Sequence, residues 1–404
     1  MSETFIVVGA GQAGLQICDS VRKEGYTGQL LLVGDEELAP YQRPPLSKQF
    51  LEGELDVDRL PFRPPNFFEK KDITLMLGEA VGRIDVNKKT ILIGTREINF
   101  HKLAIATGTR VRKLPIPGGE LEGVHYLRTV ADANGIKDAL QNAKSLVAIG
   151  GGFIGLEIAA VARKMGLAVS VIEAQGRLME RAVSPTISEY FSKVHSDAGV
   201  NVLLNSAVSA IGKREDGFVI TLADGQEIKT DMCVAGIGAV PNVEIAEAAG
   251  VECNNGIVVD CFGRTSLEDV FAAGDCTMHE NAKLKVRHRL ESVQNAVDQA
   301  KTVAAIMMGL EKPYEQIPWF WSDQYDKKLQ MVGRSKDADE EVLRGQPGEH
   351  SFSVFYFKEG NLIGVESVNQ AKDHMLGRKM LNNDIHLTTT QAADETLDLK
   401  TLTS

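Results

Sequence analysis

Two glycine-rich turns constrain the fold of this chain more than any other feature. The first, Gly9-Ala10-Gly11-Gln12-Ala13-Gly14, follows an apolar run that ends at Val8, and the second, Gly150-Gly151-Gly152-Phe153-Ile154-Gly155, follows one that ends at Ile149. Each turn joins a strand-like run to a helix-like run, where glycines permit a tight turn and let backbone N–H groups reach a pyrophosphate at the start of a helix. We therefore expect two dinucleotide-binding sites in one chain.

An acid after the next strand-like run completes each unit. The run Leu30 to Val33 is followed by Gly34-Asp35-Glu36, and the run Val169 to Ile172 is followed by Glu173. These acids stand about 20 residues beyond the glycines, the spacing of a carboxylate that binds ribose hydroxyls. A single glycine turn can serve packing alone, but two complete units indicate dinucleotide binding. A protein with two such sites is expected to move electrons between two dinucleotides.

The second unit interrupts the first. A chain of 404 residues allows roughly two to four domains. The later run Val270 to Ala273, which ends in Gly274-Asp275, is of the type that completes the first unit. We expect an α/β fold in which residues 1–112 and 243–320 form one Rossmann-like domain and residues 113–242 form a second, with an α+β domain over residues 321–404.

The last part of the chain has a different pattern. After about Trp321 the strand-like runs are Leu329–Val332, Glu341–Arg344, Phe352–Phe357 and Leu362–Val368. Such runs predict an antiparallel sheet accompanied by helices. The polar stretch from Thr388 onward is the part of the chain in which we expect disorder.

Charge and hydropathy exclude several classes of partner. The formal net charge is −11, whereas a nucleic-acid-binding protein needs a basic face. No apolar stretch reaches the 18 or so uncharged residues of a membrane helix, and the start, Met1-Ser2-Glu3-Thr4, lacks the basic segment of a secretory signal. We expect a cytoplasmic protein that binds neither nucleic acid nor membrane.

The five cysteines carry no recognisable redox or metal pattern. They are scattered, without a Cys-x-x-Cys pair or the spacing of metal ligands, at Cys18, Cys233, Cys253, Cys261 and Cys276. Buried, inert thiols are the default interpretation, although Cys276 follows Asp275 closely enough to lie near a cofactor. The missing pair argues against a disulfide reductase, and no metal site is expected.

Several further motifs extend over nearly the whole chain. They are Arg43-Pro44-Pro45-Leu46-Ser47-Lys48, Tyr126-Leu127-Arg128-Thr129, Phe153-Ile154-Gly155-Leu156-Glu157, Gly274-Asp275-Cys276, Glu291-Ser292-Val293-Gln294-Asn295-Ala296 and Trp319-Phe320-Trp321-Ser322-Asp323-Gln324. With these motifs the chain resembles the FAD-dependent, NADH-linked ferredoxin reductases of bacterial oxygenase systems, a group that includes the putidaredoxin, palustrisredoxin and rhodocoxin reductases. The resemblance implies a glutathione-reductase-like arrangement, with FAD in the first dinucleotide-binding domain and NAD in the second.

The resemblance also implies which residues bind tightly held, non-covalent FAD. They are Gly9, Gly11, Ala13, Gly14, Asp35, Arg43, Lys48, Val81, Arg128, Asp275 and Val293. Asp35 would bind the ribose, although Glu36 and Glu37 beside it leave open which carboxylate does so. A cation such as Lys48 can stabilise negative charge on a reduced flavin, and Arg128 can neutralise phosphate. Without the resemblance, Lys48 reads as a surface lysine.

For NADH the resemblance implies a second set of residues. They are Gly150, Gly152, Phe153, Ile154, Gly155, Glu173 and Gly238. Glu173 would accept hydrogen bonds from the adenosine ribose and repel the extra phosphate of NADPH, although Arg177 lies nearby. We expect Glu157 to form an ion pair with Lys48 when nicotinamide is absent. The alternative for Glu157 is an acid that complements the helix dipole.

The implied activity is that of an NADH-dependent ferredoxin reductase (EC 1.18.1 class). Hydride passes from NADH to FAD, and electrons pass singly to a [2Fe-2S] ferredoxin that feeds a cytochrome P450 or Rieske oxygenase. The catalytic candidates are Lys48, Glu157 and Trp321. Trp319, Phe320 and Trp321 would form an aromatic rim for the partner, and core packing of the last domain is the alternative.

The partner is expected to be acidic and to dock near Trp321 and a basic cluster. That cluster consists of Lys283, Lys285, Arg287, His288 and Arg289, and a solvated loop is its alternative interpretation. The protein is expected to be a monomer or a weak dimer. The competing functions are a rubredoxin reductase, an NADH oxidase, and an NADH-sensing flavoprotein similar to the apoptosis-inducing factors.

Overall fold

The computed structural model describes residues 3–403, so the first two residues of the amino-terminal segment considered above lie outside it. The chain divides into two compact units. Unit 1 contains the chain up to Gln42, Asp58–Arg110 and Val240–Pro318. Unit 2 contains Arg43–Val57, Val111–Ala239 and the chain from Trp319 onward. The division into three domains expected from the sequence stays a prediction.

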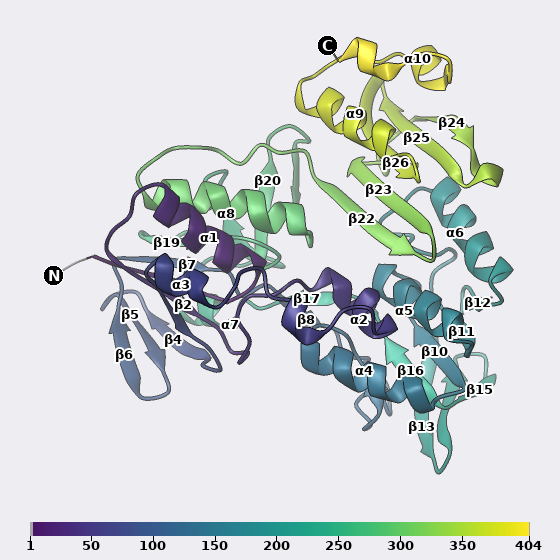
Figure 1. Cartoon of the computed structure of the whole chain (residues 1–404), viewed down its shortest axis with the longest axis horizontal. Helices are drawn as coiled ribbons and strands as arrows, with labels where there is room; N and C mark the ends of the chain where they lie inside the picture. Colours follow the sequence, from purple (N-terminus) through teal and green to yellow (C-terminus); the bar gives the residue numbers. More distant parts are fainter. Residues whose placement is uncertain (1–2, 404) are drawn as a thin grey trace. The chain divides into compact units, whose positions relative to one another are not determined.

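Unit 1 is built on a parallel sheet with the strand order β19-β7-β1-β2-β3. Strands β19, β7 and β2 of this sheet are labelled in Figure 1. The strands are β1 (Thr4–Val8), β2 (Gln29–Val33), β3 (Ile73–Met76), β7 (Lys102–Ile105) and β19 (Val270–Ala272). Because β19 pairs with β7, the late segment completes the first sheet, as the sequence predicts. All five residues of β1 are buried, and the four that follow Thr4 are apolar, as expected for a strand covered on both faces.

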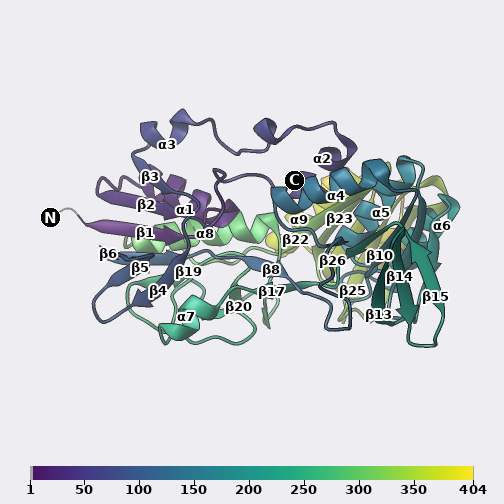
Figure 2. The same cartoon turned by 90° about the horizontal axis from the view of Figure 1, so that it is seen from below.

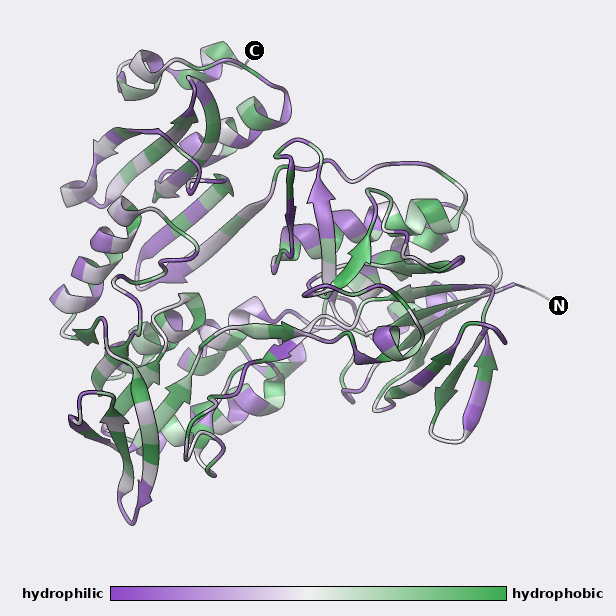
Figure 3. Ribbon diagram, turned by 180° about the vertical axis from the view of Figure 1, so that it is seen from behind, coloured by the Kyte–Doolittle hydropathy of each residue, from purple (hydrophilic) through white to green (hydrophobic). Residues whose placement is uncertain are grey.

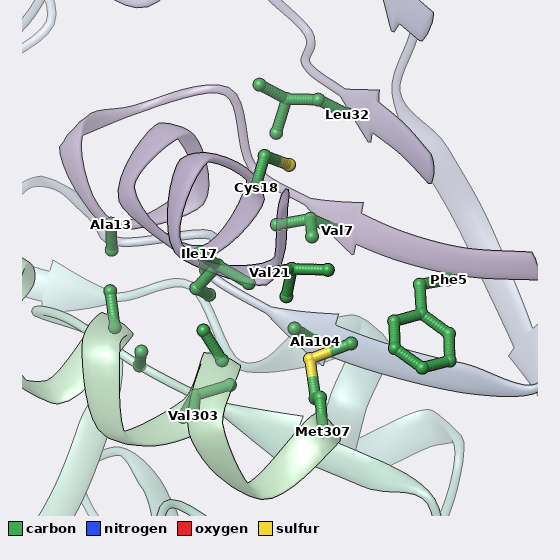
Figure 4. Close-up of a cluster of buried hydrophobic side chains, with 14 of the residues drawn as sticks. Phe5, Val7, Ala13, Ile17, Cys18, Val21, Leu32, Ala104, Val303 and Met307 are labelled. Carbon is green, nitrogen blue, oxygen red and sulfur yellow. The ribbon is translucent and has the colours of Figure 1, made fainter. Parts of the chain in front are cut away.

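Two helices cover one face of this sheet. Helix α1 (Gln12–Lys23) and helix α8 (Val293–Met307) lie side by side, with Ile17, Val21 and Val303 pointing into a common core (Figure 4). Helix α1 has an apolar stripe at helical spacing, and the Ser292 hydroxyl caps α8 by accepting from the Asn295 N–H at 3.0 Å. Helix α3 (Asn66–Lys70) contributes Phe68 to the same core.

The other face of the sheet carries smaller elements. They are the antiparallel sheet β4 (Val81–Asp85), β5 (Thr90–Ile93) and β6 (Arg96–Asn99), helix α7 (Glu244–Ala248), and the strands β18 (Ile257–Val259), β20 (Thr277–Asn281) and β21 (Val286–His288). Figure 2 shows β4, β5 and α7 together on one side of β1 and β2. The apolar side chains of β4, β5, α7 and β18 form a second core with β1, β2 and β7. Strands β8 (Thr109–Val111) and β17 (Ala239–Pro241) pair where the chain leaves and re-enters this unit.

Unit 2 repeats the parallel architecture with the strand order β12-β11-β10-β16-β9. The elements are β9 (Val124–His125), α4 (Val130–Asn142), β10 (Ser145–Ile149), α5 (Phe153–Lys164), β11 (Ala168–Ile172), α6 (Pro185–Asp197), β12 (Asn201–Leu203) and β16 (Met232–Ala235). An antiparallel sheet of β13 (Val208–Arg214), β14 (Gly217–Leu222) and β15 (Glu227–Thr230) packs its apolar residues against this sheet. The short helices η1 (Pro44–Ser47) and α2 (Gln49–Glu52) also belong to unit 2.

The carboxyl-terminal part of unit 2 is an antiparallel sheet with the order β22-β23-β26-β25-β24. Its strands are β22 (Trp319–Gln324), β23 (Lys327–Gly333), β24 (Glu340–Gln346), β25 (Ser351–Lys358) and β26 (Asn361–Val368), followed by helix α9 (Ala371–Asn382). Figure 3 shows apolar residues along the strands and alternating polar and apolar patches on the helices. The predicted fold class is therefore confirmed: two Rossmann-like parallel sheets and an antiparallel sheet with helices.

The expectation of disorder from Thr388 onward is wrong for residues 388–403. Helix α10 (Thr389–Ala393) begins at a capping box between Thr388 and Gln391, and a 3₁₀ turn (Leu399–Leu402) follows. The Arg344 guanidinium donates to the carbonyl oxygens of Ala392, Asp394 and Leu397 at 3.2, 2.5 and 2.8 Å. The Arg344 side chain, which is distant in the sequence, thus satisfies three backbone acceptors of the carboxyl-terminal segment. These hydrogen bonds order a polar segment that has no large apolar face.

Within residues 3–403, no helix is both long enough and apolar enough to cross a membrane.

Candidate dinucleotide sites

The glycine turn of unit 1 leaves an open helix N-terminus. Gly9 has φ +112°, and a Cβ there would overlap the carbonyl oxygen of Ala106. A Cβ on Gly14 would overlap the carbonyl oxygen of Gly9, so these two glycines are required by packing. A Cβ on Gly11 would meet no atom within 4 Å, and Gly11 is the N-cap of α1 without a side-chain cap. Space and unsatisfied N–H groups at a helix N-terminus suit a phosphate.

The acid of unit 1 is displaced from the strand end. Gly34 follows β2 directly, and a Cβ there would lie 2.5 Å from the Cβ of Ala10. A carboxylate for the ribose must therefore come from the next residues. The Tyr41 hydroxyl donates to Glu36 Oε2 at 2.6 Å, whereas Asp35 is exposed. This geometry favours Asp35 over Glu36 as the ribose ligand.

Asp275 stands in the turn after β19, and this turn comes close to the start of α1. Gly274, with φ +88°, approaches Ala13 so closely that a Cβ would lie 3.1 Å from the Ala13 Cβ. The Gly274 N–H donates to Gln299 Oε1 at 2.8 Å, which holds the turn that carries Asp275 against α8. Val293 is the first residue of α8. Val81, the first residue of β4, is buried on the other side of the sheet.

The glycine turn of unit 2 has the same construction. Gly150 has φ +104°, and a Cβ there would lie 2.5 Å from the carbonyl oxygen of Gly236. A Cβ on Gly155 would overlap the carbonyl oxygen of Gly150, whereas a Cβ on Gly152 would have its nearest contact at 4.0 Å. Gly238 has φ +115° in the segment that follows β16. The start of α5 therefore offers a second phosphate cradle.

Glu173 is held in place by the backbone that it follows. Its Oε2 accepts from the Gly151 N–H at 2.7 Å, and its Oε1 accepts from the Gln175 N–H at 2.8 Å. Arg177 is turned away, because its guanidinium donates to the carbonyl oxygens of Val183 and Glu180 at 2.8 and 2.9 Å. The Glu173 carboxylate would repel the 2′-phosphate of NADPH, and Arg177, whose donors are already used by backbone carbonyls, is not placed to bind it. The arrangement therefore favours NADH over NADPH.

The first turn of α5 presents apolar side chains. Ile154 is 42% exposed, which is unusual for a large apolar residue of a parallel-sheet unit. The ring of Phe153 lies 4.9 Å from that of Phe320 on β22. An exposed isoleucine at the start of α5 suits contact with a flat ring of a dinucleotide.

Lys48 and Glu157 form the ion pair that the sequence analysis expects. Lys48 Nζ lies 2.7 Å from Glu157 Oε2, and the Glu157 residue is only 3% exposed. The hydroxyls of Ser47 and Ser322 also donate to this carboxylate, at 2.5 and 2.7 Å. Sequence reasoning missed both serines, although each stands inside a motif used for the resemblance. A buried carboxylate with three donors is satisfied, so this acid does more than complement a helix dipole.

Arg43 and Arg128 lie on neighbouring segments of unit 2. The Arg43 guanidinium donates to the Arg128 carbonyl oxygen at 2.7 Å, and the Arg128 N–H donates to Asp132 Oδ2 at 3.0 Å. The residues assigned to FAD are thus divided between the units. Arg43, Lys48 and Arg128 belong to unit 2, and the glycines, Asp35, Val81, Asp275 and Val293 belong to unit 1. Their joint contribution to one site stays a prediction.

The aromatic residues of β22 are partly exposed, so simple core packing does not describe them. The rings of Trp319 and Trp321 lie 5.7 Å apart. The Arg378 guanidinium lies 4.4 Å from the Trp319 ring centroid. Phe320 points instead toward α5, as its contact with Phe153 shows. The two tryptophans therefore share one face of the strand.

The basic cluster belongs to a hairpin and not to an irregular loop. Its residues flank or form β21, which pairs with β20. Lys285 and Arg287 are exposed, whereas Arg289 is largely covered and pairs with Glu291 at 2.5 Å. The exposed positive charge of the hairpin is thus carried mainly by Lys285 and Arg287.

All five cysteines are free thiols. Cys18, Cys233 and Cys276 are buried, but Cys253 and Cys261 are only half-buried, which corrects the expectation for these two. Burial raises the pKa of Cys233 to about 12 and that of Cys253 to about 11. Burial also raises the pKa of Cys276, so the thiol nearest the predicted FAD residues is protonated at neutral pH.

Comparison with known proteins gives concordant matches. Residues 3–300 match the family model described as pyridine nucleotide-disulphide oxidoreductase, and residues 319–403 match the model described as reductase C-terminal. The chain is 46% identical over 399 residues to the rhodocoxin reductase of Rhodococcus erythropolis, with 98% of this chain and 93% of that protein covered.

Two solved structures are also similar. One is the ferredoxin reductase for the CYP199A2 system from Rhodopseudomonas palustris, with TM-score 0.97, 44% identity and full coverage of both chains. The other is putidaredoxin reductase in its covalent complex with putidaredoxin, with TM-score 0.96, 34% identity, and coverage of 99% of this chain and 98% of that chain. The chain therefore belongs to the pyridine nucleotide-disulphide oxidoreductase family and carries its reductase C-terminal domain.

Proposed function

We propose that the protein is an FAD-containing, NADH-dependent ferredoxin reductase that supplies single electrons to a [2Fe-2S] ferredoxin of an oxygenase system. The observation that carries the proposal is the pair of open helix N-termini, at Gly11 and at Gly152, each followed by an acid near the end of the next strand. The similarity to rhodocoxin reductase over nearly the whole chain supports the same activity.

The first cradle fits FAD. The start of α1 has room for a pyrophosphate at Gly11, and Asp35 would bind the ribose, with Glu37 as the other exposed carboxylate of this loop. Gly274 brings Asp275 close to Ala13, where a hydroxyl-rich chain of the cofactor would need an acceptor. Lys48, Arg43 and Arg128 would add positive charge from unit 2, Val81 would border the adenine side, and Val293 would contact the ring edge.

The second cradle fits NADH. Gly150, Gly152 and Gly155 would receive the pyrophosphate, and Glu173 would bind the adenosine ribose. Phe153 and Ile154 would contact the nicotinamide ring from one side. The Gly238 segment would line the opposite side of the same slot. The ion pair between Lys48 and Glu157 shields both charges from water.

Hydride transfer requires no general acid or nucleophile from the protein. When bound, FAD supplies a ring system that accepts a hydride and returns electrons one at a time. The residues of the chain orient the two ligands and exclude water, and Lys48 provides a cation where negative charge develops. The tryptophans of β22 would give the acceptor an apolar contact surface.

The ferredoxin is proposed to use two candidate surfaces. One is the basic hairpin of unit 1, with Lys283, Lys285, Arg287 and Arg289, and the other is the tryptophan face of β22 in unit 2. Opposite charge would steer an acidic partner, and aromatic side chains would supply binding energy. A monomer or weak dimer in the cytoplasm stays a prediction, which sedimentation and cell fractionation would test.

The deciding experiment is an anaerobic titration of the purified yellow protein with NADH, followed by addition of candidate acceptors. We expect NADH to bleach the flavin absorbance and a two-iron ferredoxin to restore it rapidly. Faster oxidation by a rubredoxin or by oxygen would assign one of the competing activities. Negligible turnover with a long-lived charge-transfer band would indicate an NADH-sensing role. Protein that stays colourless after incubation with FAD would refute the proposal.

The role of Trp321 is testable in separate half-reactions. We expect Trp321→Ala to slow reduction of the ferredoxin about tenfold, the size of effect that removal of an interface tryptophan commonly has. Reduction of the flavin by NADH should change less than about twofold, because the tryptophan face is not part of the proposed nucleotide cradle. An equal loss in both half-reactions would contradict the assignment. Leu343→Ala, which removes an exposed apolar side chain on β24, is the control.

A further inference from the structure

Glu157 is one end of a longer row of buried polar side chains within unit 2. The Ser322 hydroxyl donates to Glu157 Oε1 at 2.7 Å, and Gln324 Nε2 donates to Ser322 Oγ at 3.2 Å. Gln324 Oε1 lies 2.9 Å from His195 Nε2 on α6. Ser322, Gln324 and His195 have relative exposures of 0%. A polar row this deeply buried needs every member satisfied.

All donors in the row point the same way. Because the Gln324 amide nitrogen donates to Ser322, its oxygen accepts, and His195 therefore carries a proton on Nε2. The other ring nitrogen, Nδ1, then accepts from the Tyr325 hydroxyl at 3.4 Å. Burial lowers the pKa of His195, in keeping with a neutral ring. Hydrogen bonds aligned in one direction strengthen one another, and here the alignment ends on the carboxylate of Glu157.

The row determines how that carboxylate is oriented. Ser322 occupies Oε1, and this leaves Oε2 for Ser47 and Lys48. If the Glu157 carboxylate rotated, Lys48 Nζ would either lose its contact with Oε2 or move together with that oxygen. Strand β22 supplies Ser322 and Gln324 from one face, because alternate residues of a strand share a face, while Trp321 lies on the other.

We propose that Ser322, Gln324 and His195 are positioning residues that fix the Glu157 carboxylate and, through it, the ammonium group of Lys48. The inference deepens the proposed function and rests on it only where Lys48 is assigned to the flavin. A side-chain amide in the row does not pass protons in its ordinary form, so the row orients groups and does not conduct protons. Its effect on the reaction is therefore on geometry.

The position of Lys48 can be measured without turnover. Full-length protein containing FAD is treated briefly with formaldehyde and a borohydride reagent, and methylation of Lys48 is quantified by peptide mass spectrometry relative to exposed Lys193. We expect the ratio to rise about tenfold in Ser322→Ala and in Gln324→Met, the factor that corresponds to about 1.4 kcal/mol for a lost hydrogen bond to a charged network. Ser322→Thr keeps the hydroxyl and should restore the wild-type ratio.

The matched control is Ser353→Ala. Ser353 is equally buried in the same antiparallel sheet and donates to Ser367 Oγ at 2.9 Å, away from Glu157. The control should leave the ratio unchanged, which separates loss of the row from general loosening of the sheet. An unchanged ratio in both Ser322→Ala and Gln324→Met, or a rise of the same size in Ser353→Ala, would overturn the proposal.

A stopped-flow measurement then links position to reaction. We expect the maximal rate of flavin reduction by NADH to fall about tenfold in Ser322→Ala and Gln324→Met, with little change in the NADH concentration for half-maximal rate, and to recover in Ser322→Thr. Altered methylation with unaltered reduction would refute the positioning role in catalysis. A wild-type protein that NADH does not reduce would refute the proposed function instead, and the methylation ratios would still decide whether the row positions Lys48.

Discussion

Glu173 has two roles at one place in the structure. Its oxygens accept from the Gly151 and Gln175 N–H groups and hold the glycine turn, while its charge faces the position proposed for the adenosine ribose. A substitution there changes both the loop and the charge. Two variants are needed to separate these effects.

We expect Glu173→Gln to keep one side-chain oxygen that accepts from a backbone N–H and to weaken NADH use about tenfold, because a hydrogen bond to a charged group is replaced by one to a neutral group. Glu173→Arg should weaken NADH use further and improve the use of NADPH, because repulsion of the 2′-phosphate becomes attraction. The ratio of kcat/KM for the two nucleotides is the measurement. No gain with NADPH in Glu173→Arg relative to Glu173→Gln would contradict the assignment.

At the scale of elements, the glycines in the turns before α1 and α5 fall into two groups: some are required by packing, and others leave room for a ligand. Gly14 and Gly155 face backbone oxygens and are required for packing, whereas a Cβ on Gly11 would meet nothing within 4 Å and one on Gly152 nothing closer than 4.0 Å. The sequence motif does not distinguish these two groups, but the structure does. Substitution by alanine should therefore separate folding from ligand binding.

We expect Gly11→Ala to destabilise unit 1 by about 1 kcal/mol or less and to yield folded protein that fails to retain FAD, because the new methyl group occupies the cradle. Gly14→Ala should destabilise the unit by about 3 kcal/mol or more, because its methyl group overlaps the Gly9 carbonyl. Thermal unfolding and the flavin-to-protein absorbance ratio are the measurements. Gly11→Ala protein with a full complement of FAD would contradict the prediction.

Local pattern was enough to predict the main elements but not the contacts between distant segments. Glycine spacing and apolar runs predicted both parallel sheets, and the run at Val270 correctly indicated how the first sheet is completed. Ser47 and Ser322 were missed because they meet Glu157 from positions 110 and 165 residues away. The order of the tail was missed for a similar reason, since Arg344 binds carbonyl groups about 50 residues further along, which carry no sequence signal.

At the scale of the whole molecule, buried histidines make stability depend on pH. Burial lowers the pKa of His279 and of His374 to about 4. Both rings are neutral in either state well above pH 6.5. As the pH falls from about 6.5 toward 4, the unfolded chain binds protons that the folded chain does not, so stability is lost. His279 belongs to unit 1 and His374 to unit 2, so each unit should respond.

We expect each of these histidines to account for about 2 kcal/mol of the stability lost between pH 6.5 and pH 5. His279→Gln and His374→Gln should each reduce that loss by about this amount. Urea unfolding at both pH values is the measurement, with His386→Gln as a control because His386 is exposed at the surface. Variants as sensitive to acid as the wild type would contradict the prediction.

The discontinuity of unit 1 has a consequence for biosynthesis. Residues 111–239 emerge from the ribosome as a continuous stretch, and their parallel sheet contains all of its strands before β19 and α8 have been translated. The strands made first, β1 and β2, meanwhile have α1 but lack α8, the second helix that covers their sheet, for about 300 residues of synthesis, or roughly 15 to 60 seconds at ordinary elongation rates. During that interval the first sheet exposes the apolar side chains that α8 later buries, and we expect chaperones to bind there.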